Sequence, residues 1–180
     1  MKITLCGLAG VGTSSAGKAI ANPPKWPFVS AGDYFRDIAV QESITHTELE
    51  RRSRQDFKYD KEIDRRTVRF GEDNRDTGFV FDGRLAWYFI PYSFKILLTC
   101  DFDTRVDRVA RRDRVPFDTA QSLTLEREEI ARERYGALYG LSDFDDPKHF
   151  DIVVDTTANT QDEVATHLLD AWVNHPRPFK

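Results

Sequence analysis

The sequence predicts an α/β fold in which a parallel β-sheet is covered by helices on both faces. Short apolar runs alternate along the chain with longer polar or amphipathic stretches, and the apolar runs lack the period-two polarity of half-exposed strands. A glycine-rich turn, GLAGVG, directly follows the first apolar run. With 180 residues, the chain is most simply one domain with a substantial core.

The elements are expected in the following order. Strands are predicted over 2–6, 28–30, 79–83, 94–101 and 150–156, where apolar runs end at small or polar residues. Helices are predicted over 12–21, 33–41, 45–56, 59–73, 104–114, 119–140 and 160–175. The tail over 176–180 is expected to be loose. Two helical segments, about 31–75 and about 104–140, are too charged to serve only as cover for the sheet, and we expect them to lie over a site.

Composition and charge weigh against several classes of protein. The net charge of −4 gives no general attraction to nucleic acid or to an acidic membrane, so neither partner is expected. Two cysteines in apolar runs indicate buried thiols of a reducing compartment, and the four histidines show no zinc-binding spacing. We find neither a bilayer-length apolar run nor the pattern of a signal peptide, which favours a cytoplasmic location. A monomer is expected.

Residues 7 to 18, GLAGVGTSSAGK, fit the phosphate-loop pattern G-x-x-x-x-G-K-[ST] in two registers, each with one departure. The register that starts at Gly7 has Thr13 in place of lysine. The register that starts at Gly12 has Lys18 but lacks the final hydroxyl. A phosphate loop begins where its strand ends, because its amides must be free to face the anion. We therefore choose the first register, with a turn that binds no nucleotide as the alternative. The expected ATP-binding residues are Gly7, Gly10, Val11, Gly12, Thr13, Ser14 and Ser15.

The missing loop lysine needs a substitute. Lys18 lies four residues after Ser14 on one helix face and is one candidate; arginines of the charged segments are the other. Ser14 is expected to face Mg²⁺, bound together with ATP, because this hard cation prefers oxygen ligands. Asp82 closes the apolar FVF run and is expected on the same metal. A helix-capping Ser14 and a structural Asp82 are the alternatives.

Five stretches in this order resemble the archaeal-type cytidylate kinases of the nucleoside monophosphate (NMP) kinase superfamily: GLAGVGTSSAGKAIA, SAGDYFRDIA, YDKEIDRR, FDGRLAW and RERYGALYGL…FDIVVDTT. The likeness covers nearly the whole chain, and the loop threonine is also similar to that group. The resemblance implies a three-layer P-loop kinase fold with a five-stranded parallel sheet and one kinase domain over 1–180. Its CORE would comprise 1–30, 76–103 and 141–180, with an NMP-binding insertion at about 31–75 and a LID at about 104–140.

The resemblance also implies roles for single residues. Arg36 and Arg84 would hold the acceptor phosphate, a task that suits the planar fork of arginine. LID arginines would close over the phosphates and exclude water. The expected catalytic residues are Lys18, Arg84, Arg108, Arg112 and Arg127. The expected acceptor-binding residues are Ser30, Gly32, Asp33, Arg36, Asp60, Asp64, Asp82, Gly83 and Arg84. Asp33 is expected to cap the helix that carries Arg36. The alternative for Asp60, Asp64 and many of the arginines is that they are solvent-exposed charged side chains on helix surfaces, without a role in binding.

The predicted reaction is transfer of the ATP γ-phosphoryl group to CMP, or to dCMP or UMP. Phosphoryl transfer needs aligned phosphates, exclusion of water and positive charge, and no general base is required here because a phosphate oxygen attacks. One alternative is a P-loop kinase for AMP or a non-nucleotide acceptor. Another is a catalytically silent nucleotide-binding module, which only the absent loop lysine supports.

Overall fold

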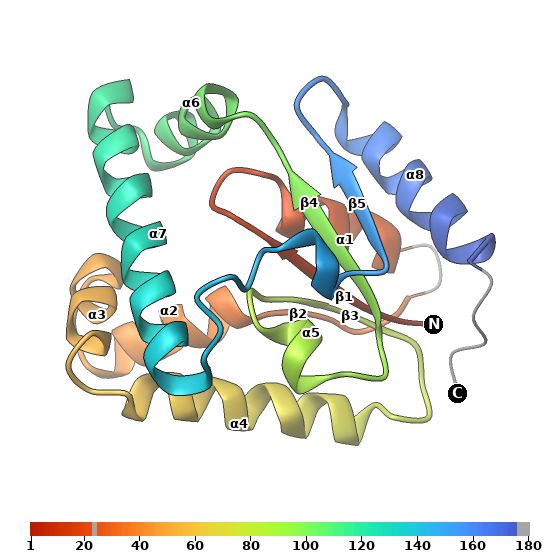
Figure 1. Ribbon diagram of the computed structural model, residues 1–180, viewed down its shortest axis with the longest axis horizontal. Coiled ribbons are helices and arrows are strands. Elements are labelled where there is room, and N and C mark those ends of the chain that lie inside the picture. Colours follow the sequence, from red (N-terminus) through yellow and green to blue (C-terminus); the bar gives the residue numbers. More distant parts are fainter. Residues whose placement is uncertain (23–24, 176–180) are drawn as a thin grey trace.

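The computed structural model describes residues 1–22 and 25–175, so the tail expected to be loose lies outside the described residues. One parallel sheet contains five strands in the order β2–β3–β1–β4–β5 (Figure 1). The strands are β1 (Lys2–Gly7), β2 (Phe28–Ser30), β3 (Phe79–Asp82), β4 (Phe94–Thr99) and β5 (Ile152–Asp155). Each predicted strand is therefore confirmed, with ends that shift by at most two residues.

The helices also follow the expected order. They are α1 (Thr13–Ala21), α2 (Ala31–Gln41), α3 (His46–Ser53), α4 (Lys58–Asp73), α5 (Ala86–Phe89), α6 (Phe102–Asp113), α7 (Phe117–Tyr139) and α8 (Gln161–Val173). The sequence prediction misses α5 and a 3-10 turn at Pro147–His149, because so few residues show no helical period of their own.

Alternate side chains of the central strands pack on opposite faces of the sheet. Ile3 and Leu5 of β1 belong to a core that α1 and α8 cover. Cys6 of β1 and Leu97 of β4 belong to a second core with side chains of α5 and α7. Both cores are shielded from water, which explains why the strands are apolar without interruption. The three-layer α/β fold is thus confirmed.

The sheet topology places one loop at its centre. The chain passes from β1 to β2 and β3 on one side and to β4 and β5 on the other. A crevice forms at the carboxyl ends of parallel strands where the order reverses, and here it lies beside the loop between β1 and α1. In Figure 1, helices α2, α3, α6 and α7 stand at the side of the molecule opposite the two termini. The division into CORE, NMP-binding insertion and LID stays a prediction.

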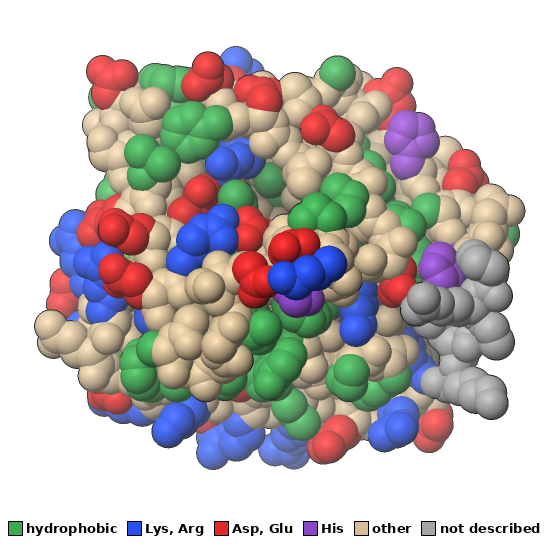
Figure 2. Space-filling model, viewed as in Figure 1, with side chains coloured by type: hydrophobic (Ala, Val, Ile, Leu, Met, Phe, Trp, Pro, Cys, Tyr) green, Lys and Arg blue, Asp and Glu red, His purple; other side chains and the backbone are tan. Residues whose placement is uncertain are grey.

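Charges of both signs are mixed on the surface. Figure 2 shows acidic and basic side chains beside one another at the left of the molecule, where α3 and α7 meet. Arg51 of α3 pairs there with Glu126 of α7, and Arg54, which follows α3, pairs with Glu133 of α7. Across residues 1–22 and 25–175, no helix combines the length and the apolar character needed to cross a bilayer.

Candidate active site

The loop between β1 and α1 adopts the first of the two registers. The chain leaves β1 at Gly7 and enters α1 at Thr13. Gly10 and Gly12 have φ angles of 88° and 95°, a left-handed conformation that suits glycine. Gly17 is buried within α1 against Phe28, so its amide is not part of the loop. The loop register chosen from the sequence is therefore the one in the structure.

Donors from distant segments hold successive carbonyl oxygens of this loop. Arg105 donates to Ala9 O at 3.2 Å, and Arg108 donates to Gly10 O at 3.3 Å. The Thr156 hydroxyl donates to Val11 O at 2.8 Å. Because N–H and C=O point in opposite directions across a trans peptide, the amides of Gly10 and Gly12 point away from these donors. Both glycines line the cavity described below, so the loop can present amides to an anion.

The close approach of α6 makes Gly10 more sensitive to substitution than Gly12. A Cβ atom on Gly10 would lie 2.4 Å from Arg105 O, whereas one on Gly12 would meet nothing within 4 Å. We expect Gly12→Ala to lower the free energy of unfolding by about 1–2 kcal/mol through backbone strain alone. Gly10→Ala should cost about 2–4 kcal/mol, because overpacking adds to that strain. Urea denaturation of both variants measures the difference, and equal losses would contradict this close approach.

A cavity of about 900 Å³ opens beside the loop. Its size lies in the range of small-molecule binding sites. The structure brings most of the expected site residues to its wall: Gly7, Gly10, Val11, Gly12, Thr13, Ser14, Ser15, Ser30, Gly32, Arg36, Asp60, Asp64, Asp82, Gly83, Arg84, Arg108 and Arg112. Lys18, Asp33 and Arg127 are not among the lining residues. Segments far apart in the sequence thus meet around one site.

Ser14 and Asp82 form an oxygen pair at the floor of this site. The Ser14 hydroxyl donates to Asp82 Oδ2 at 2.6 Å, and the Ser30 hydroxyl donates to the same oxygen at 3.1 Å. Burial raises the pKa of Asp82, while the hydroxyls of Ser14, Thr13 and Ser30 oppose that rise. Among the described residues, no group of three or more His, Cys, Asp or Glu could hold a metal ion. One hydroxyl and one carboxylate suit Mg²⁺, which keeps water and phosphate ligands, so these two residues fit the expected metal.

Arg84 offers a positive charge to the cavity. It lies two residues after the end of β3 and lines the wall, and within the described part of the chain no carboxylate forms an ion pair with its guanidinium. Arg36 of α2 also lines the wall, and it pairs with Asp33 one turn earlier. Asp33 does not cap α2 as expected: Ser30 is the N-cap residue, and its hydroxyl accepts from Gly32 N at 3.2 Å. The predicted cap is wrong because α2 begins two residues before the predicted start of the helix.

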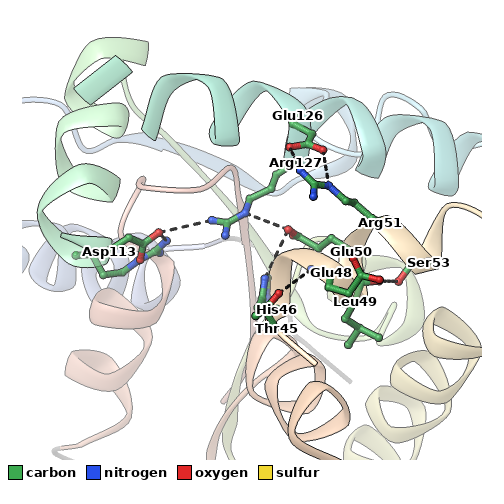
Figure 3. Close-up of polar contacts among 11 residues, drawn as sticks. Thr45, His46, Glu48, Leu49, Glu50, Arg51, Ser53, Asp113, Glu126 and Arg127 are labelled. Carbon is green, nitrogen blue, oxygen red and sulfur yellow. Dashed lines mark hydrogen bonds and ion pairs between the residues drawn. The ribbon is translucent and has the colours of Figure 1, made fainter. Parts of the chain in front are cut away.

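Two further residues do not reach the cavity as the sequence suggests. Lys18 is exposed on α1, because the helix starts at Thr13 and carries this side chain away from the loop. Arg127 lies between two carboxylates, Glu50 at 3.0 Å and Asp113 at 3.8 Å, as Figure 3 shows. Arg127 itself does not line the cavity, although its partner Glu50 does. Arg112 does line the wall, although it also pairs with Asp113.

Several functional candidates escape the sequence reasoning. Arg105 and Thr156 hold the loop carbonyls, Glu50 engages Arg127, and Arg134 forms a buried pair with Asp60. Arg134 lies in the RERYG stretch that carries the family likeness, which is the one signal that could have drawn attention to it. No local spacing pairs it with Asp60, since 74 residues separate the two.

The chain is similar to known kinases in sequence and in fold. The model of the cytidylate kinase-like family matches residues 2–158. A cytidylate kinase of Methanothermobacter thermautotrophicus is 34% identical, with 87% of this chain and 95% of the relative covered. A cytidylate kinase of Haloarcula marismortui is 35% identical, with 87% and 81% covered. A shikimate kinase from Bacteroides thetaiotaomicron superposes with a TM-score of 0.61 over 96% of this chain and 98% of its own; at 14% identity, it supports the fold alone.

Proposed function

Because the chain belongs to the cytidylate kinase-like family and is an ATP-dependent phosphotransferase, we propose that it transfers the γ-phosphoryl group of ATP to CMP. The loop amides would bind the ATP phosphates. Ser14 and Asp82 would hold Mg²⁺, which supplies positive charge on the phosphate oxygens. The cytidylate kinase names of the relatives support an NMP kinase role and suggest CMP as the acceptor.

The observation that carries the proposal is the convergence of two kinds of group on one cavity. The loop amides and the Ser14–Asp82 pair line one part of its wall, and Arg36 and Arg84 line it as well. Arginine favours phosphate through bidentate hydrogen bonds, so the same space can hold the phosphates of a donor and of an acceptor. Two phosphates aligned in a cleft that excludes water are the main requirement of phosphoryl transfer.

Arg108 is our proposed substitute for the missing loop lysine. Its guanidinium lines the cavity and is fixed by Gly10 O, by Thr156 Oγ1 at 3.1 Å and by Thr156 O at 2.7 Å. This anchoring places a permanent positive charge beside the loop. Arg112 lies on the same face of α6 and is proposed to contribute on closure, once a phosphate competes with Asp113. The alternative of a silent nucleotide-binding module has no support beyond the absence of the loop lysine.

We expect a panel of nucleoside monophosphates with ATP and Mg²⁺ to give the highest kcat/KM for CMP. ADP release, measured for CMP, dCMP, UMP, AMP and GMP, tests this directly. Strong turnover of AMP with none of CMP would overturn the assignment of the acceptor. Tight ATP binding without transfer to any monophosphate would favour the silent module instead.

A further inference from the structure

The cavity wall contains a buried ion pair that has no part in the phosphate binding proposed above. Arg134 of α7 donates through Nε and Nη2 to the two carboxylate oxygens of Asp60 on α4. Their side chains are only 6% and 4% exposed, yet both residues line the cavity. A buried pair bears a desolvation cost that apolar side chains would avoid, so its place on this wall points to ligand binding.

A second acid lies one helical turn further along α4. Asp64 lines the cavity and accepts a hydrogen bond from the Tyr139 hydroxyl through Oδ2. Within residues 1–22 and 25–175, no hydrogen bond engages Oδ1 of Asp64 or Nη1 of Arg134. The wall therefore offers one carboxylate acceptor and one guanidinium donor to a ligand.

The surroundings suit a flat ring. The guanidinium of Arg134 lies 5.9 Å from the ring centre of Phe35 and 5.6 Å from that of Tyr135. Both rings line the cavity, as do Ile63 and Phe89. Apolar walls with a few placed polar groups are typical of sites that bind a heterocycle.

This wall and Arg84 surround a common side chain. Burial raises the pKa of the Tyr135 hydroxyl; Arg84 and Arg134 lower it, and Asp60 and Asp64 raise it. The charges of all four residues thus affect the pKa of Tyr135. Arg84, Asp64 and Arg134 line the same cavity, so a nucleoside monophosphate whose phosphate binds Arg84 can place its base beside Asp64 and Arg134.

We propose that Asp64 and Arg134 recognise the amino-bearing edge of cytosine. Asp64 accepts from the exocyclic N4–H group, while Arg134 donates through Nη1 to ring N3 or O2 and is positioned by Asp60. Uracil has an acceptor at O4 and a donor at N3. Its O4 atom would therefore face the acceptor of Asp64, and its N3–H group would face the donor of Arg134. The inference rests on the proposed function, because it requires a pyrimidine monophosphate in this cavity.

Asp64→Asn is the test. The amide is similar in size to the carboxyl group but can donate to the O4 atom of uracil. We expect the CMP-to-UMP ratio of kcat/KM to fall at least about tenfold, mainly through a higher KM for CMP, with the KM for ATP unchanged. Asp73→Asn is the matched control, because Asp73 lies on the same helix but is 65% exposed and pairs with Arg69. It should keep the wild-type ratio.

The pH dependence of the ratio gives a second readout. Burial raises the pKa of Asp64 to about 6; the charge of Asp60 adds to the rise, and Tyr139 and Arg134 oppose it. The groups that face Asp64 are Asp60 on its own helix and Arg134, Tyr135 and Tyr139 on α7. As pH falls through about 6, the carboxyl gains a proton, so the preference of the wild type for CMP should weaken. The Asp64→Asn variant should show no such change. Ionisation of the substrate phosphate affects CMP and UMP alike, so its effect cancels in the CMP-to-UMP ratio of kcat/KM.

The possible outcomes separate this inference from the proposed function. Turnover of CMP with an unchanged CMP-to-UMP ratio in Asp64→Asn overturns the inference and leaves the proposed function intact. A wild type that phosphorylates no nucleoside monophosphate overturns the proposed function itself. If Asp64→Asn fails to fold, the wild type decides alone: a CMP-to-UMP ratio that stays flat between about pH 5 and 7.5 overturns the inference.

Discussion

Replacement of Arg84 by alanine should lower kcat with CMP about a thousandfold while ATP affinity changes less than about threefold. Arg84 lines the cavity two residues after the end of β3, and in the described part of the chain its guanidinium has no ion-pair partner. Its charge is therefore available to a phosphate group. Arg84→Lys should recover only part of the loss, because lysine keeps the charge but not the bidentate fork. Steady-state kinetics and equilibrium ATP binding measure the two effects.

Arg111→Ala is the matched control for this prediction. Arg111 lies on α6, is 80% exposed and pairs with Asp107, so its removal should leave kcat unchanged. An Arg84→Ala variant with wild-type turnover would remove Arg84 from the acceptor site. A parallel loss of ATP affinity would instead assign Arg84 to the donor phosphates.

The loop and its partners on the sheet could be predicted because short-range rules determine them. A strand that ends at Gly7 fixes where a phosphate loop can begin, and apolar strands that end in Ser30 and Asp82 bring polar groups to one edge of a parallel sheet. Ser14 and Asp82 are 68 residues apart, yet they are in contact at 2.6 Å, as their expected place at one edge of the sheet requires; the metal between them stays a prediction. The strands and most helices were predictable for the same reason.

The arginine partners could not be predicted, because helical spacing defines a face but not what lies opposite. Arg127 was expected to close over the phosphates, but the sequence did not indicate that Glu50, which is 77 residues away on another helix, pairs with it. Arg105 looks like any charged helix residue in the sequence, yet it is 5% exposed and holds both Ala9 O and Glu128. Such pairs depend on how α3, α6 and α7 pack, which no periodicity records.

The second large effect is expected at Asp82, where activity and stability should change in opposite directions. Asp82→Asn removes a charge proposed to hold Mg²⁺, so kcat should fall at least about a hundredfold and half-maximal activity should need more Mg²⁺. Burial raises the pKa of this carboxyl, which means that its charge destabilises the folded protein when no cation is bound. The neutral amide removes that penalty. We therefore expect a higher Tm for the metal-free variant at neutral pH.

The sign of the pH dependence separates this account from a structural role. Because the folded-state pKa is raised, wild-type stability falls as pH rises from about 4, the pKa in the unfolded chain, through the higher folded value. The Tm advantage of Asp82→Asn should accordingly vanish at about pH 4 and below. Asp101→Asn is the control: Asp101 also ends an apolar run, but it caps α6 by accepting from Thr104 N, and asparagine can make the same capping bond. Because the hydrogen bonds with Thr104 lower the pKa of Asp101, this variant should gain no stability at neutral pH. A lower Tm for Asp82→Asn, with activity retained, would mean that Asp82 serves the fold and that another group must hold the metal.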